Sequence, residues 1–215
     1  MTLAELRTRF RIEEQDTAAP YLWSDAELAI WINEAQDEAC RRGLLLVDSR
    51  SVASKATFSA SAIGVDLHPS VIFVRRACLA SSNIPLVPKV ARSMDEEVPG
   101  WEGSMASVPR VFVPDWETSY LRFWPPSVAS GTVNMTVVRT PLDVASDGDD
   151  MEILPRYQPY LLEWVRFRAY SKQDAEVFNP AKAKASEALF ISQFGQASAV
   201  NEHWALEQYY DIGHN

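Results

Sequence analysis

The feature that most constrains this fold is a helix over residues 24–43 whose two ends are both encoded in the sequence. Ser24 is a favourable N-cap, and Glu27 completes a capping box in which each residue satisfies a backbone N–H group of the other. Trp23 precedes the cap at the position of a hydrophobic staple, and Gly43 is placed to end the helix in the left-handed conformation. One stripe of the helix is apolar and must pack on other elements, through Leu28, Trp31, Ile32, Ala35 and Ala39.

Further helices are predicted near both ends of the chain. Thr2 and Glu5 form a second capping box ahead of a short helix that ends near Phe10. Helical spacing returns over residues 157–169, and another helix is bounded by the N-cap Asn179 and by Gly195 (residues 179–195). These helices must cover or extend the first one.

The middle of the chain alternates apolar and polar residues, which is typical of strands with one buried face. Pro85 and Pro88 restrict one of these strands to a sheet edge, and a third capping box, Ser93 with Glu96, predicts a short helix over residues 93–98. Short spacings between strands favour antiparallel pairing, with the last three strands as a meander. The predicted strands cover residues 56–60, 63–67, 71–79, 84–87, 111–113, 120–124 and 132–139.

The sequence therefore predicts an α+β fold. Its helical layer is formed by the N- and C-terminal helices, and an antiparallel β-sandwich or open barrel is inserted between them. The expected domains are a helical one over residues 1–45 and 143–215 and a β domain over residues 46–142.

Composition limits the function. Hydrophobic residues make up 47% of the 215 residues and charged residues 23%, as in an ordinary globular protein, and the formal net charge is -9. Arg41-Arg42 and Arg75-Arg76 are the longest basic runs, which argues against a nucleic-acid-binding surface. An acidic wall, however, is what DNA could slide past without sticking.

Nothing in the sequence predicts a cofactor, a metal site or a catalytic motif. Cys40 and Cys78 have apolar neighbours and are expected to be buried thiols. The histidines (His68, His203, His214) lack a metal-binding arrangement, and the acidic run Asp143, Asp147, Asp149, Asp150 and Glu152 lacks the order of a calcium loop and is interpreted as a flexible, solvated turn. Two carboxylates at glycosidase separation stay possible.

The sequence also shows no pattern typical of a targeting signal. The residues after Met1 lack the basic segment and apolar run of a signal peptide, and no window reaches the length of a membrane span. We expect the chain to be made and kept in a cytoplasm until assembly.

Two stretches resemble a known family. Pro20-Tyr21-Leu22-Trp23-Ser24-Asp25 with Asn33-Glu34-Ala35, and later Tyr170-Ser171-Lys172-Gln173-Asp174 with Phe194-Gly195, are similar to the head-to-tail adaptor (connector) proteins of tailed bacteriophages. The resemblance implies a virion protein without catalysis, in a homo-oligomeric ring of twelve beneath the portal protein. It also implies downstream tail proteins (nozzle, tail tube or tail fibres) as partners, and genomic DNA passing through the lumen.

Two other functions stay open from the residues. The first is a phage-associated muralytic enzyme that cuts the bacterial cell wall, and the second is a monomeric binding module. If DNA passes through, the channel wall should expose carboxylates from connecting segments, such as Glu13, Glu14 and Asp16 or Asp147 to Asp150.

The aromatic residues suggest where partners bind. Trp23, Trp31 and Trp164 are assigned to the core, whereas Trp101, Trp116 and Trp204 lie in turns or near the tail and are candidates for protein contacts. The tail over residues 197–215 follows a terminated helix yet carries large apolar groups. It is expected to contact the portal through Trp204, Tyr209, Tyr210 and Ile212.

Overall fold

Helix α2 (Asp25–Gly43) has the N-terminus that the sequence predicts. Ser24 Oγ accepts a hydrogen bond from Glu27 N at 3.2 Å, and Glu27 Oε2 accepts one from Ser24 N at 3.0 Å. The C-terminus differs, because Gly43 stays helical and Leu44 takes the left-handed conformation at φ 50°. A Cβ at position 43 would lie 2.8 Å from Leu45 Cδ2, so a larger residue there would have to displace the Leu45 side chain.

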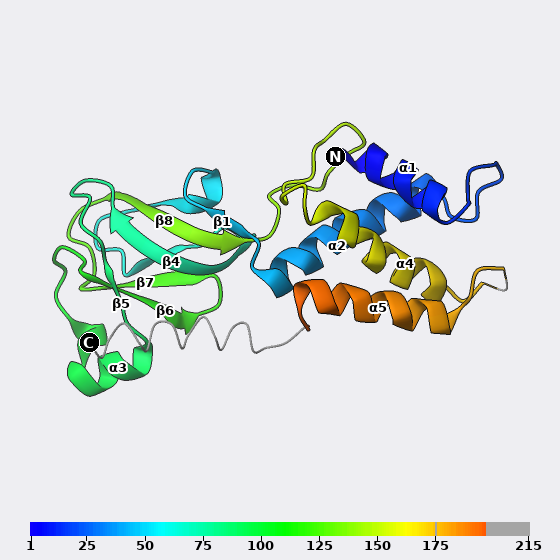
Figure 1. Cartoon of the computed structure of the whole chain (residues 1–215). Coiled ribbons are helices and arrows are strands. Elements are labelled where there is room, and N and C mark those ends of the chain that lie inside the picture. The colour runs from blue at the N-terminus through cyan, green and yellow to red at the C-terminus, as the bar shows by residue number, and fades with distance from the viewer. Residues whose placement is uncertain (175, 197–215) are drawn as a thin grey trace. The chain divides into compact units, whose positions relative to one another are not determined.

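The computed structural model describes residues 1–174 and 176–196 and confirms an α+β fold (Figure 1). Within that part the chain forms two compact units, a helical unit of residues 1–46 and 140–196 and a β unit of residues 47–139. None of the described helices combines the length and apolar character that crossing a membrane requires. Besides α2, the helical unit contains α1 (Leu3–Glu13), the 3₁₀ turn η3 (Gln158–Tyr160), α4 (Leu161–Ser171) and α5 (Pro180–Phe194).

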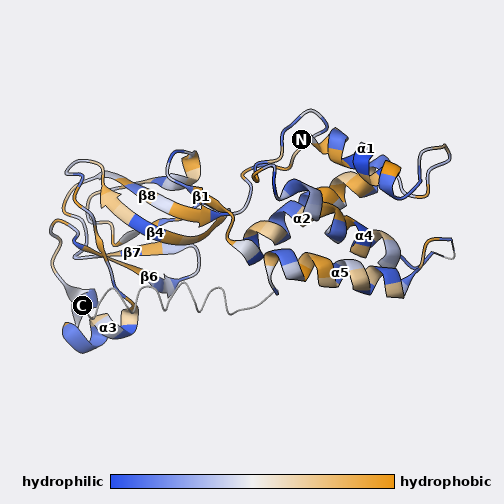
Figure 2. Cartoon of the chain, viewed as in Figure 1, coloured by the Kyte–Doolittle hydropathy of each residue, from blue (hydrophilic) through white to orange (hydrophobic). Residues whose placement is uncertain are grey.

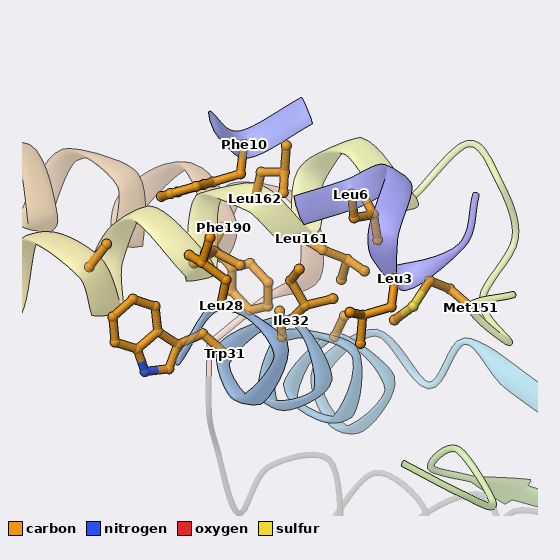
Figure 3. Packing of buried hydrophobic residues seen from close by; sticks show 14 of the residues in the cluster. Leu3, Leu6, Phe10, Leu28, Trp31, Ile32, Met151, Leu161, Leu162 and Phe190 are labelled. Atoms are coloured by element: carbon orange, nitrogen blue, oxygen red, sulfur yellow. The ribbon is translucent and has the colours of Figure 1, made fainter. Parts of the chain in front are cut away.

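The core of the helical unit lies between these four α-helices, and Figure 3 shows their apolar side chains meeting there. The capping box of Thr2 with Glu5 is confirmed, and so is Asn179 as the N-cap of α5. Helix α1 continues past Phe10 because an ion pair between Arg9 and Glu13 stabilises its last turn. The fully buried core includes Leu3, Leu6, Phe10, Leu28, Ile32, Leu161, Leu162, Val165 and Phe190.

The β unit consists of two four-stranded sheets. In the first sheet β8 (Gly131–Arg139) is central, with β4 (Val71–Leu79) on one edge and β1 (Leu46–Asp48) and β2 (Lys55–Phe58) on the other. The second sheet has the order β3 (Gly64–Asp66), β7 (Tyr120–Trp124), β6 (Val111–Glu117), β5 (Val87–Pro88). The short 3₁₀ turns are η1 (Val52–Ser54) and η2 (Trp101–Gly103).

Two predicted pairings in the β unit are wrong. Strand β8 leaves the expected meander and joins the first sheet, where both of its edges find partners. Strand β5 lies at a sheet edge as expected but runs parallel to β6, because the chain between them crosses over through a helix. The two sheets share one core, to which both contribute, with Val74, Ala77, Val133, Val137, Phe112, Leu121 and Phe123.

A smaller core covers the outer face of the second sheet. Helix α3 (Ala91–Glu97) lies there, and it begins two residues earlier than predicted, so the expected capping box of Ser93 and Glu96 is wrong. No side chain next to α3 in sequence caps it, and Asp115 Oδ1 accepts the hydrogen bond from Ala91 N at 2.9 Å instead.

The tryptophan assignments are partly confirmed. Trp23 and Trp31 are buried and Trp164 packs against the helical core. Trp101 was expected in a contact surface, but it is 2% exposed and belongs to the smaller core, with the half-buried Trp116 packed on it edge to face. Cys40 and Cys78 are both buried, as expected of structural thiols.

Candidate interaction surfaces

No metal centre is visible in the part of the chain that the structure describes, where no three His, Cys, Asp or Glu side chains cluster. His68 is hydrogen-bonded to Ser70, whose hydroxyl lies 2.9 Å from His68 Nδ1. His203 and His214 lie outside the described residues.

A buried ion cluster ties the end of α1 to α4 and α5. Arg166 Nε donates to Glu14 Oε1 at 2.6 Å, and Lys182 Nζ donates to Glu14 Oε2 at 2.6 Å. Arg166 also binds Glu13 and Glu163, and the Tyr170 hydroxyl donates to Glu14. Burial would raise the pKa of Glu14, but hydrogen bonds from Lys182, Tyr170 and Arg166 outweigh it and lower that pKa.

A second ion cluster fixes the loop between α1 and α2. Arg11 Nη1 donates to Asp16 Oδ2 at 2.5 Å, Arg11 Nη2 donates to Asp25 Oδ1 at 2.7 Å, and Asp16 Oδ1 accepts from Leu22 N at 2.9 Å. The side chains of Glu14 and Asp16 are only 4% and 3% exposed. Neither carboxylate is exposed enough to face a channel, so the expectation that Glu14 and Asp16 line one is wrong.

These clusters support an exposed apolar surface at one end of the helical unit, where the α1–α2 and α4–α5 loops both lie in Figure 1. The Arg11 guanidinium lies 3.8 Å from the centroid of the Tyr21 ring. We call this surface the loop end, and its exposed side chains are Ile12, Tyr21, Leu22 and Phe178.

The acidic loop, residues 142–150, is held in place rather than flexible. Asn33 Nδ2 donates to Ala145 O at 3.1 Å and Asn33 Oδ1 accepts from Ala145 N at 2.9 Å. Arg7 makes two hydrogen bonds to the Asp147 carboxylate, at 2.8 and 2.9 Å. Hydrogen bonds from Ser146 lower the pKa of Asp149. The expectation of a flexible turn is corrected, although its four aspartates are exposed as expected.

An apolar tip lies at one end of the β unit, where three connecting segments are hydrogen-bonded to one another. Ser61 N donates to Ser127 O at 2.7 Å, and Val128 N donates to Ser107 O at 3.0 Å. Met105, in the middle segment, is 92% exposed. The exposed side chains of the apolar tip are Ile63, Met105, Val108 and Val128.

An aromatic corner holds a cation on the second sheet. The Arg122 guanidinium lies 4.0 Å from the Trp116 ring centroid and 4.8 Å from the Trp101 ring centroid. Arg122 is 7% exposed, and its Nε has no hydrogen-bond partner within the described chain. Cation–π attraction to two perpendicular rings is what offsets the burial of this charge.

A family model described as "SU10 adaptor protein" matches residues 1–209. The chain belongs to this family of phage head-tail adaptors. A search of the curated proteins found no match. As an adaptor, the chain is a component of the phage virion, and its family is not a class of enzymes.

The adaptor's first sheet carries a cationic face, which we define as Lys55, Arg75 and Arg76. Lys55 is paired with Asn134 of β8, and Arg76 with Thr136, so both lie on the side away from the core residues Val133, Met135 and Val137. Arg75 is the extra residue of a bulge between Val74 and Arg76. In the described part of the chain, no carboxylate forms an ion pair with any of the three.

Sequence reasoning and the structure agree on few of the adaptor's contact residues. Trp204, Tyr209, Tyr210 and Ile212 lie outside the described residues, so their role stays a prediction. The apolar tip was missed because Met105, Val108 and Val128 lie in irregular segments without periodicity, and Ile63 was assigned to the strand predicted over residues 63–67. Only the Arg75-Arg76 doublet was visible beforehand as a charge pattern.

Proposed function

We propose that this adaptor forms a ring, twelve copies by the family resemblance, on the portal protein. In this role it extends the DNA channel and links the portal to the tail. The observation that carries the proposal is the family match over residues 1–209. The loop end and the apolar tip support it, because each presents apolar side chains on a backbone that hydrogen bonds already hold in place, which suits protein contacts.

In this proposal the two compact units act as separate domains, with boundaries at residues 45 and 142. Assembly takes place in the host cytoplasm, and the adaptor has no catalytic activity. Genomic DNA passes the lumen without specific binding, along a wall that exposes carboxylates. Glu14 and Asp16 are excluded from that wall, which leaves Glu13 and Asp147 to Asp150 of the residues first considered.

The test mixes the purified chain with portal rings and examines the product by electron microscopy. We expect a ring beneath the portal, and a largely monomeric chain without the portal, because subunits of net charge -9 repel one another. A closed ring at micromolar concentration without portal contradicts the templating, and no density on the portal contradicts the function.

The rival function, a muralytic enzyme, rests on the sequence alone, and no observation in the described residues favours it. A zymogram on peptidoglycan tests it directly. Clearing by the purified chain would replace the structural role by an enzymatic one.

We further propose that the tail over residues 197–215 contacts the portal through Trp204, Tyr209, Tyr210 and Ile212. Aromatic residues are typical interface anchors, and a chain end can reach a neighbour. Deleting the tail should abolish retention on portal rings and leave the thermal midpoint unchanged. Retained binding, or a large loss of midpoint, assigns the tail to the subunit's own structure instead.

A further inference from the structure

The charges of the two units are unequal, and this inequality leaves specific groups without partners. The helical unit, residues 1–46 and 140–196, has 11 Lys and Arg against 18 Asp and Glu, whereas the β unit, residues 47–139, has 9 against 8. The net charges are thus -7 and +1. A subunit with an acidic part and a slightly basic part can attract a second copy only when unlike parts meet.

On the β unit, the three exposed cations of the cationic face lie together on the first sheet. Lys55 and Arg76 flank β8 on opposite sides, next to the polar residues Asn134 and Thr136. The same sheet surface also carries the buried residues Cys78 and Val138. Figure 2 shows a hydrophilic band within the otherwise hydrophobic β4, and Arg75 and Arg76 are the charged residues in the sequence of this strand. Of the other basic residues of this unit, Lys89, Arg92 and Arg139 form ion pairs with carboxylates, whereas Arg50, Arg110 and Arg122 form none within the described residues.

Arg75 and Arg76 also lie on β4, at an edge of the first sheet. Strand β4 pairs only with β8 along Val71 to Arg76 in the part of the chain that the structure describes. Bulges and charged side chains at such an edge oppose the addition of another strand. A partner on this face must therefore bind through its side chains, and carboxylates are the groups that the three cations select.

On the helical unit, the acidic loop offers such carboxylates in a fixed arrangement. Its backbone is bound to Asn33 and to the start of α1, where Leu3 N donates to Asp149 O and Ala4 N to Asp147 O, each at 3.2 Å. Asp143 and Asp150 are exposed, and between them Val144 is 80% exposed. Because the loop is already ordered, its binding costs little conformational entropy.

We infer that the acidic loop of one copy docks on the cationic face of the next copy in the ring. This inference rests on the proposed ring. A closed ring uses two different patches of each subunit, and the chain carries two patches of opposite charge on different units. The contact places Asp147 to Asp150 between subunits, so Glu13 is then the remaining channel-wall candidate among the carboxylates first considered. It is also weak enough alone, in a chain of net charge -9, to need the portal as template.

Charge reversal tests the contact. The variant Arg75→Glu/Arg76→Glu and the variant Asp143→Lys/Asp150→Lys should each lower ring occupancy on the portal at least tenfold. The variant with all four changes has the wild-type net charge and should recover occupancy to within about threefold, because the attraction is reversed but kept. Lys184→Glu/Arg156→Glu is the matched control, since it adds the same negative charge to exposed residues of the helical unit and should not reduce occupancy.

Three results overturn the inference: unaltered occupancy in either double variant, no recovery in the fourfold variant, or an equal loss in the control. If the wild-type chain forms no ring on the portal, this result refutes the proposed function instead. The contact is then tested separately by mixing Arg76→Cys chains with Asp143→Cys chains at high concentration under oxidising conditions. A mixed disulfide dimer, absent when Lys184→Cys replaces Arg76→Cys, supports the contact, and its absence refutes it.

Discussion

The helical and β units of this adaptor treat their charged residues in opposite ways. In the helical unit most of the described arginines and lysines form ion pairs with carboxylates, and two of these carboxylates, Glu14 and Asp16, are buried. In the β unit Lys55, Arg75 and Arg76 are exposed on one face, and the Arg122 guanidinium packs on two aromatic rings without an ion pair to any described carboxylate. Charge therefore stabilises the helical unit internally, while the β unit keeps charge available for a partner.

The contrast between the charged residues of the two units is tested most directly at Arg166. Arg166→Met removes the cation that binds three carboxylates and leaves the buried Glu14 with only Lys182 and Tyr170 as partners, so we expect a loss of about 2–3 kcal/mol in the free energy of unfolding. Urea unfolding followed by circular dichroism measures it. Arg168→Met is the matched control two residues away, because its half-exposed pair with Glu34 should contribute at most about 1 kcal/mol. Equal losses in the two variants would contradict the idea that burial makes the ion pairs of Arg166 more stabilising than the half-exposed pair of Arg168.

The cap of α3 tests how the β unit uses a carboxylate. Asp115→Ala removes the acceptor of the Ala91 amide and should cost about 1 kcal/mol of unfolding free energy. Ser93→Ala, at the cap position that the sequence suggested, should lower the unfolding free energy by no more than a few tenths of about 1 kcal/mol. Chemical denaturation of both variants decides between the two residues, and a larger loss at Ser93 would restore the local capping box.

The pH dependence sharpens the helical side of the comparison. A hydrogen bond from Lys172, helped by Ser24, lowers the pKa of Glu27 to about 2. Since the folded pKa lies below the ordinary glutamate pKa of 4.5, the contribution of Glu27 is complete above pH 4.5 and is lost as the pH falls toward 2. With solvent screening of this surface pair, Glu27→Gln should cost about 1 kcal/mol at pH 7 and nothing at pH 2.

Thermal unfolding at both pH values measures this difference. Glu187→Gln on α5 is the control, because Glu187 makes no ion pair in the described chain and should leave the midpoint unchanged. A cost of Glu27→Gln that persists at pH 2 would show that packing, not the charge, is responsible.

The smallest effect is expected at Arg122. Arg122→Met gives up cation–π attraction to Trp101 and Trp116 but also removes a buried charge whose Nε is unsatisfied. These effects oppose each other, so the free energy of unfolding should change by less than about 1 kcal/mol. Urea unfolding beside Arg166→Met makes the comparison, and a loss as large as that at Arg166 would mean that both units depend equally on buried cations.

Some features of the fold were predictable because they depend on neighbouring residues. The capping boxes at Thr2 and Ser24 are formed by residues three positions apart, and the strand at residues 71–79 is β4 as predicted. The α+β class follows from the change of periodicity along the chain. Each of these depends on interactions within a helical turn or a strand, so the sequence alone determined them.

Only the tertiary structure decided which distant groups meet. The Glu14 carboxylate looks like a solvated linker residue until Arg166, 152 positions later, is packed against it. Asp115 caps a helix 24 residues earlier, and β8 pairs with β4 instead of continuing a meander. Such contacts are selected by the burial of whole faces against one another, which no local pattern encodes, and the same packing leaves Lys55, Arg75 and Arg76 without acidic partners in the described chain.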